Sequence, residues 1–317
     1  MPLPQTESRQ KYIPQTGNRV PRPNCFKPLY ETLFGYAVVV DSLAFMRELP
    51  ESSIDLVMTS PPFALNRKKE YGNVGAEVYV DWFMPFAYEV HRILKPTGSF
   101  VVDIGGTWNR GHPTRSVYQY RLLIRLAEKF CFAQEFFWHN PAKLPSPAEW
   151  VTVRRIRVTD AVNTIWWLSK TEYPKADNRR VLRPYSDSMK QLIQNGYRAK
   201  RRPSGWNIST KFGKDHGGSI PHNLLQIPNT ESNSQYLRLC KRYGVKPHPA
   251  RFPTALPEFF IKFLTEPGDI VFDCFAGSNA TGEAAETQGR YWIATECNEE
   301  YLQASRYRFA SRRDCDQ

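Results

Sequence analysis

The chain has 317 residues, of which 41% are hydrophobic and 14% aromatic, so it can bury the core of one large domain or two coupled ones. Its 43 Lys and Arg exceed its 31 Asp and Glu by a net charge of +12, which favours an anionic partner such as nucleic acid. The six cysteines form no C-x-x-C pair, no segment is apolar enough to span a bilayer, and the N-terminus lacks the apolar region of a signal peptide. We therefore expect a reduced cytoplasmic protein without a metal site. A disulfide scaffold, a membrane protein and a zinc finger are disfavoured.

The positive charge is concentrated in two segments. Residues 1–30 carry a net charge of +4 and six prolines, which predicts a flexible basic arm. Residues 171–250 carry a net charge of +10 and are rich in Gly, Pro, Ser and Asn, which predicts an irregular, loop-rich module. A solvated surface insertion is the alternative interpretation of this basic block.

Short runs of β-branched and other apolar residues alternate along the chain with segments whose apolar residues have helical spacing. This alternation predicts an α/β fold with a largely parallel sheet. The predicted strands are Tyr36–Asp41, Ile54–Thr59, Ser99–Ile104, Ala133–Trp138, Asn163–Ser169, Ile270–Asp273 and Arg290–Glu296, and the predicted helices are Val80–Ile93, Tyr118–Lys129, Leu256–Leu264, Thr281–Gln288 and Glu299–Ala310.

Ligands of open parallel sheets bind at the carboxyl ends of the strands, and unusual residues occur there. Ser60-Pro61-Pro62-Phe63 follows the second predicted strand. Two prolines fix a rigid turn and donate no N–H groups, so the carbonyl of Ser60 or Pro61 can accept from a ligand. With the Ser60 hydroxyl and the flat face of Phe63, this turn suits a planar group that bears an exocyclic amine. A simple strand-ending turn is the other interpretation.

A glycine loop, DCFAGSNATG over residues 273–282, follows a late strand and precedes a helix. Gly277 and Asn279 suit a positive φ or a close backbone approach, and the helix N-terminus offers N–H groups to an anion. Glu296 ends the next strand, where it can accept from ribose hydroxyls. Either feature alone is weak evidence, and the combination indicates a nucleotide-like ligand.

The S-P-P-F motif followed by a D-x-F-x-G-S-x-x-T-G loop resembles the DNA amino-methyltransferases, which use S-adenosylmethionine to methylate exocyclic nitrogens. The order of the motifs is similar to that of the permuted β group. The resemblance extends from about Tyr36 to Phe309 and is strongest to the type that methylates cytosine at N4. It rests on the stretches TSPPFALNRKKEYGN, GSFVVDIGG, KLPSPAEWV, GGSIPHNLLQI and HPARFPTALPEFF.

This resemblance implies a Rossmann-like methyltransferase fold with a mostly parallel seven-stranded sheet, circularly permuted, with an inserted target-recognition region. The implied parts are a basic arm (1–30), the catalytic part (31–170), the target-recognition region (171–247) and the cofactor-binding part (248–317). Because Asn tolerates the left-handed conformation, Asn279 in place of the usual glycine is expected to leave the cofactor site intact. The implied S-adenosylmethionine site contains Asp41 near adenine, Glu296 at the ribose, Asp273, Phe275, Gly277, Ser278 and Asn279 at the methionine end, and His248, Pro249, Ala250 and Phe252 in the preceding motif. A structural turn is the alternative for the last four.

The implied catalytic residues are Ser60, Pro61, Pro62 and Phe63. The target cytosine carries an exocyclic amine. Hydrogen bonds from this amine to Ser60 and a backbone carbonyl would make the nitrogen lone pair nucleophilic for direct attack on the sulfonium methyl group of the cofactor. We expect Asp103 to orient Ser60, unless it is a structural carboxylate. The base must leave the duplex, after which Phe63 could stack on it and Trp138 could line its pocket, unless Trp138 belongs to the core.

Double-stranded DNA is the expected partner, together with a possible homodimer and a restriction endonuclease of the same site that forms no stable complex with the chain. The location implied is the bacterial cytoplasm at the nucleoid. The predicted DNA-binding residues lie on the loop after the S-P-P-F motif and in the basic block: Arg67, Lys68, Lys69, Arg179, Arg180, Arg201, Arg202 and Lys211.

Other functions compete with N4-cytosine methylation. An N6-adenine methyltransferase usually has Asp or Asn at position 60, so Ser60 favours cytosine. A C5-cytosine methylase is excluded because no Pro-Cys nucleophile occurs. A DNA-binding protein that retains the cofactor pocket without catalysis stays open, and an RNA methyltransferase is disfavoured because the basic block carries no RNA-binding signature.

Overall fold

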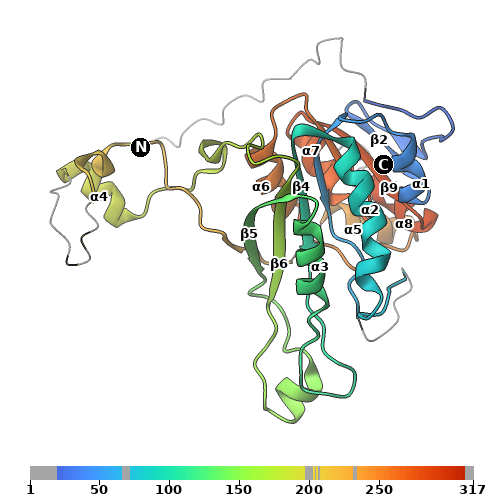
Figure 1. Ribbon diagram of the computed structural model, residues 1–317, viewed down its shortest axis with the longest axis horizontal. Helices are drawn as coiled ribbons and strands as arrows, with labels where there is room; N and C mark the ends of the chain where they lie inside the picture. The colour runs from blue at the N-terminus through green and yellow to red at the C-terminus, as the bar shows by residue number, and fades with distance from the viewer. Residues whose placement is uncertain are drawn as a thin grey trace.

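The computed structural model describes residues 20–65, 72–196, 203, 205, 208–230 and 234–310. A twisted sheet lies between two layers of helices (Figure 1). Among these residues, no helix is both long and apolar enough to cross a membrane.

Within the described residues, the sheet has nine strands in the order β1-β2-β9-β8-β3-β4-β6-β5-β7. The run from β2 to β4 is parallel, and β6 is antiparallel to both of its neighbours. The seven predicted strands form the centre, and the short β1 and β7 are added at the edges. The strands are β1 (Tyr30–Glu31), β2 (Gly35–Val39), β3 (Ile54–Thr59), β4 (Leu94–Ile104), β5 (Cys131–His139), β6 (Val162–Ser169), β7 (Leu224–Gln226), β8 (Ile270–Asp273) and β9 (Tyr291–Glu296).

Side chains on opposite faces of the sheet enter two separate cores because residues alternate along a strand. In β3, Val57 faces one core, whereas Leu56 and Met58 face the other. The first core is covered by α1 (Ser42–Glu48), α2 (Tyr79–Ile93) and α3 (Tyr118–Ala127), and the second by α6 (Ala255–Leu264), α7 (Ala280–Thr287) and α8 (Glu299–Ser305).

The predicted strands and helices are all present, and the two largest differences in length are in β4 and in the last helix. Strand β4 begins at Leu94, directly after α2, because buried Leu94 pairs with Ile54 across the sheet. The last helix ends at Ser305 rather than Ala310 and continues as a 3-10 turn, Arg306–Arg308.

Part of the predicted arm packs on the domain. The Phe26 ring lies 5.5 Å from that of Phe45, and Leu29 and Tyr30 contact the second core. The prediction of a flexible arm is therefore wrong for residues 20–30, because Phe26, Leu29 and Tyr30 pack against the two cores of the domain. Residues 1–19 lie outside the described residues.

The basic block is irregular, as predicted, but it is anchored to the domain at both ends. Lys175 forms a salt bridge of 2.7 Å with Asp269, and β7 joins the sheet beside β5. Helix α4 lies apart from the sheet (Figure 1). The helical elements of the block are η2 (Asn178–Val181), α4 (Asp187–Asn195), η3 (Thr210–Gly213) and α5 (Gln235–Arg242).

Candidate active site

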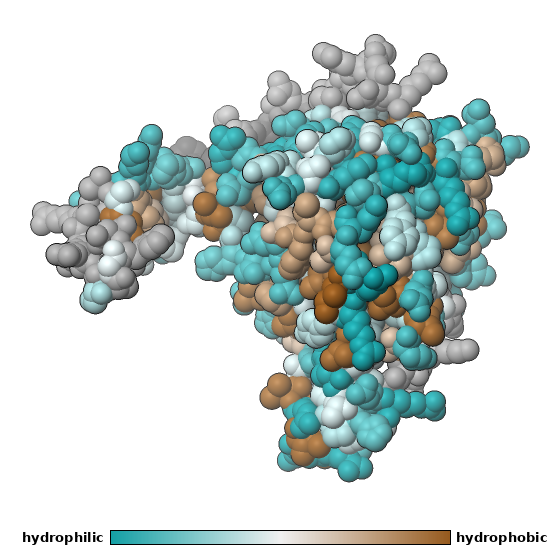
Figure 2. All heavy atoms as spheres, in the orientation of Figure 1, coloured by the Kyte–Doolittle hydropathy of each residue, from teal (hydrophilic) through white to brown (hydrophobic). Residues whose placement is uncertain are grey.

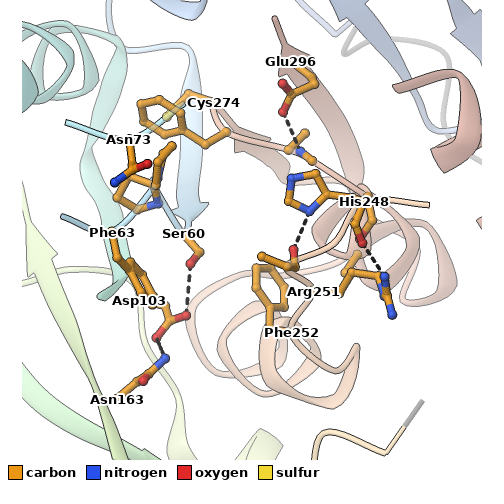
Figure 3. A pocket seen from close by; sticks show the side chains of 18 of the residues that line it. Ser60, Phe63, Asn73, Asp103, Asn163, His248, Arg251, Phe252, Cys274 and Glu296 are labelled. Atoms are coloured by element: carbon orange, nitrogen blue, oxygen red, sulfur yellow. Dashed lines mark hydrogen bonds between the residues drawn. The ribbon is translucent and has the colours of Figure 1, made fainter. Parts of the chain in front are cut away.

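A cavity of about 680 Å³ opens where the parallel strands end. This volume suits a ligand of cofactor size. One wall carries Ser60, Phe63 and Asp103, and the facing wall carries His248 and Glu296 (Figure 3). Segments distant in the sequence therefore meet at one edge of the sheet, as the positions of the motifs predict.

The Ser60 hydroxyl donates to Oδ2 of Asp103 over 3.1 Å. Ser60 follows β3, and Asp103 lies near the end of the adjacent β4, so the parallel pairing brings them together. Because the Ser60 proton points to the carboxylate, the oxygen lone pairs remain for a ligand donor. The predicted bond between these two residues is confirmed, and the role of Ser60 in catalysis stays a prediction.

Asp103 is only 2% exposed, and burial raises its pKa to about 6. Three groups oppose this effect by favouring the ionised carboxylate. The Ser60 hydroxyl is one, the Asn163 amide donates to Oδ1 over 3.3 Å, and the Lys143 cation attracts the carboxylate. The pKa of Lys143 is itself lowered by burial. Asn163 and Lys143 come from β6 and the loop after β5, and the sequence motifs assigned neither of them to the site.

The Phe63 ring lies against the backbone at Gly105, where an added Cβ would stand 2.5 Å from Cε2 of the ring. A larger residue at position 105 would thus displace Phe63 from the cavity wall. The Tyr79 hydroxyl donates to the Pro62 carbonyl over 2.8 Å. Pro62 therefore already has a protein partner. Trp138 belongs to the second core, as its alternative interpretation predicts, and it also lines the cavity; contact with the base stays a prediction.

The glycine loop takes the predicted backbone conformation, with φ of 50° at Gly277 and 53° at Asn279. Asn279 caps α7 by accepting from the Gly282 N–H over 3.0 Å and donates to the Tyr30 hydroxyl over 2.9 Å. Its side chain therefore shapes the loop and does not line the cavity. An added Cβ at Gly277 would stand 3.2 Å from the His248 ring, so glycine keeps the loop close to this wall.

Asp273 also shapes the loop from within the protein. Its carboxylate accepts from the hydroxyls of Thr59 and Thr281, each over 2.7 Å, and from the Phe275 N–H over 3.1 Å. It is 1% exposed, and burial raises its pKa to about 6. Phe275, Gly277 and Ser278 line the cavity beside it.

Glu296 faces the cavity at the end of β9 (Figure 3). One oxygen accepts from the Gly277 N–H and the other from the Asn298 N–H, both over 2.9 Å. Each oxygen keeps acceptor capacity for a ligand hydroxyl. Asp41, the other predicted acid, lines the same cavity and caps α1 through the Ala44 N–H over 2.9 Å.

The segment from His248 to Phe252 forms the facing wall, with His248, Ala250 and Phe252 lining the cavity. The His248 ring lies edge-on to Tyr301 at 4.6 Å, and burial lowers its pKa, so the ring is neutral at pH 7. Pro249 lies in this turn, outside the lining residues.

The predicted DNA-binding residues divide into three groups. Lys211 is exposed, and exposed Arg179 pairs with Asp177 over 2.7 Å. Arg180 is engaged within the protein, donating to the Thr265 carbonyl over 2.8 Å, so a structural role explains it. The others, Arg67, Lys68, Lys69, Arg201 and Arg202, lie outside the described residues.

Arg308 is a buried residue that the sequence motifs did not indicate. It donates to the Ser278 carbonyl over 2.6 Å, to the Ser278 hydroxyl over 3.0 Å and to Glu283 over 2.6 Å. The 3-10 turn that follows α8 thereby fixes the glycine loop. The sequence could have indicated its burial, because Arg308 lies on the apolar face of the last predicted helix, Glu299–Ala310.

The chain belongs to the DNA methylase family, whose model matches residues 54–306. It is 58% identical over 288 residues to the type II methyltransferase M.PvuII of Proteus hauseri, a match that covers 89% of this chain and 86% of the relative. It is 47% identical over 303 residues to M.BglI of Bacillus subtilis, covering 84% and 82%.

The solved structure of the PvuII DNA methyltransferase (cytosine-N4-specific) matches with a TM-score of 0.74 and 51% identity over 90% of each chain. This agreement confirms the methyltransferase fold that the sequence predicted. The DNA adenine methyltransferase YhdJ of Escherichia coli K12 is 25% identical over 269 residues, covering 83% of this chain. Relatives of this chain therefore include proteins named for either base.

Proposed function

We propose that this chain is a site-specific DNA methyltransferase that uses S-adenosylmethionine to methylate N4 of a cytosine flipped out of duplex DNA. The observation that carries the proposal is the Ser60–Asp103 hydrogen bond in a cavity shared with the glycine loop and Glu296. The identity of 58% to M.PvuII and the structural match to a cytosine-N4-specific enzyme support it.

The residues of the cavity fit the cofactor. The positive φ of Gly277 and the absence of a Cβ leave a cradle beside His248, and Glu296 keeps acceptors for ribose hydroxyls. Bound S-adenosylmethionine supplies an electrophilic methyl group. Phe275, Gly277, Ser278 and Glu296 would hold it, with Asp41 near the adenine.

Ser60 and a backbone carbonyl accept hydrogen bonds from the two N–H groups of the amine on the flipped base. Asp103 holds the Ser60 proton, so the Ser60 lone pairs face the amine. The Pro62 carbonyl accepts from Tyr79, and we assign the second acceptor to the carbonyl of Ser60 or Pro61. These bonds draw the amine out of conjugation with the ring and hold it for attack on the sulfonium methyl group. As the N–CH3 bond forms, the S–CH3 bond would break, S-adenosylhomocysteine would leave with the bonding electrons, and the amine would release one proton to water. Phe63 stacks on the base.

The test is methylation of duplex DNA in vitro, followed by mass spectrometry of the digested product and sequencing around the modified base. N4-methylcytosine is expected. N6-methyladenine as the sole product would assign the chain to the adenine-specific enzymes, and no product despite binding of both ligands would identify a non-catalytic DNA-binding protein.

We further propose that residues 171–247 form the target-recognition region and that the enzyme acts at the bacterial nucleoid. Among the residues of this region that the structure describes, we propose Lys211 and Arg179 as contacts to DNA. We also propose two protein partners. One is a second copy of the chain in a homodimer, and the other is a restriction endonuclease that recognises the same DNA site but forms no stable complex with the chain.

We expect the turnover rate kcat to fall on acidification. Burial raises the pKa of Asp103 to about 6, so the carboxylate that holds the Ser60 proton becomes protonated below this pH. Below about pH 6, kcat should fall about tenfold per pH unit. Because burial also raises the pKa of Asp273 to about 6, protonation there should instead raise KM for the cofactor. Measuring kcat and KM against pH separates the two effects.

Replacing Lys143 with methionine should shift the acid limb of the kcat profile to higher pH. The Lys143 cation favours the ionised form of Asp103, and its loss raises the carboxyl pKa further. Lys143→Arg retains the charge and should restore the limb. An identical acid limb in wild type and Lys143→Met would contradict this electrostatic role.

A further inference from the structure

Two loops that are separate in the sequence form a projecting lobe below β5, β6 and α3 (Figure 1). The projecting lobe consists of residues 105–117, which follow β4, and residues 140–161, which follow β5 and contain the helix η1 (Glu149–Val153). Both loops leave the same edge of the sheet as the candidate active site.

Hydrogen bonds tie the two loops together. The Asp160 carboxylate accepts from the Trp108 indole over 2.7 Å and pairs with Arg115. Arg157 donates to the Pro113 carbonyl over 2.8 Å. Within the second loop, the Asp160 N–H donates to the Ser146 carbonyl over 3.1 Å. These contacts give the lobe a defined shape.

The lobe carries a net positive charge that the charge distribution along the sequence does not show. Its two loops contain six Lys and Arg against two acids, a net charge of +4, although the chain outside residues 1–30 and 171–250 carries a net charge of −2. Arg110 and Arg155 are exposed, and neither side chain forms an ion pair or hydrogen bond with the described part of the chain. Arg155 also has a φ of 55°, which is uncommon for a residue other than glycine.

The base of the lobe forms part of the candidate active site. Asn140, Lys143 and Ala161 line the cavity that also contains Ser60. A nucleotide that enters this cavity stays joined to its strand, so the neighbouring phosphates must pass its rim. The lobe stands on that rim.

We propose that the projecting lobe binds the DNA backbone beside the flipped nucleotide, through Arg110 and Arg155. This surface is additional to the basic block at residues 171–247, and the inference depends on the proposed function only in taking duplex DNA as substrate. Exposed apolar side chains on the lobe, including Val153 at 68% and Val158 at 85%, would also suit a protein partner (Figure 2). The net charge and the contact with the cavity favour DNA.

The test measures the affinity for a labelled 30-base-pair duplex of mixed sequence from 50 to 200 mM salt, with Arg110→Gln, Arg155→Gln and the double variant. Each lost phosphate contact should reduce the slope of log affinity against log salt by about 0.9, and the double variant should bind on the order of tenfold more weakly. Arg47→Gln is the matched control. Arg47 is exposed near the C-terminal end of α1, which runs away from the cavity edge. Binding of S-adenosylmethionine should stay at the wild-type value.

A salt slope in the double variant equal to that of Arg47→Gln would overturn the proposal. So would a change in sedimentation of the double variant without a change in slope, because the lobe would then be an interface between copies of the chain. Ethylation interference should lose signals at phosphates on one side of the target base in Arg110→Gln. The binding assay needs no methyl transfer. An adenine product would therefore revise the proposed function alone, whereas an unchanged slope would refute the lobe alone.

Discussion

Replacing Ser60 with alanine should slow methyl transfer about a hundredfold, because one preorganised hydrogen bond to the reacting amine is lost. Alanine fits the turn, so affinities for the cofactor and for DNA should stay within about twofold. Single-turnover rates on duplex DNA measure the chemical step, and separate titrations measure binding.

Ser53→Ala is the matched control for this variant. Ser53 precedes β3 and Ser60 follows it, so the two substitutions remove the same group from opposite ends of one strand. Asp103→Asn should also be slow, and the double variant Ser60→Ala, Asp103→Asn should be little slower than Ser60→Ala alone, because the two side chains act through one hydrogen bond. A wild-type rate in Ser60→Ala would refute the proposed mechanism.

Replacing Glu296 with alanine should weaken S-adenosylmethionine binding about tenfold to a hundredfold. Hydrogen bonds to a charged group contribute about 1.5–3 kcal/mol, and each 1.4 kcal/mol changes affinity about tenfold. The variant loses the acceptors for ribose and also the bond that holds the Gly277 N–H over 2.9 Å. Calorimetry with the cofactor alone measures the effect without DNA.

Glu300→Ala removes a carboxylate from the exposed first turn of the neighbouring α8 and should leave the affinity unchanged. Glu296→Gln keeps the shape and one acceptor, so it should fall between wild type and Glu296→Ala. If Glu296→Ala bound the cofactor as tightly as Glu300→Ala does, the ribose site would have to lie elsewhere.

The sequence by itself determined the elements and the identity of the motifs. Strand β3 has the predicted bounds because its apolar run is stopped by two prolines, and Asn279 is left-handed as predicted because few other residues accept that conformation. Such features depend on the periodicity of a segment and on the backbone preferences of single residues, both of which are local. The resemblance to a family then assigned roles to residues at matching positions.

The tertiary structure alone decided which side chains share an environment. Asn163 and Lys143 act on Asp103, Arg308 fixes the glycine loop, and two loops combine their charge in the projecting lobe. The anchoring of residues 20–30 was decided in the same way. Each of these depends on strand order and on the packing of segments far apart in the chain. Charge and polarity summed along the sequence do not show which side chains become neighbours. Burial and distance in the folded molecule determine the interaction energy of each pair of neighbouring side chains.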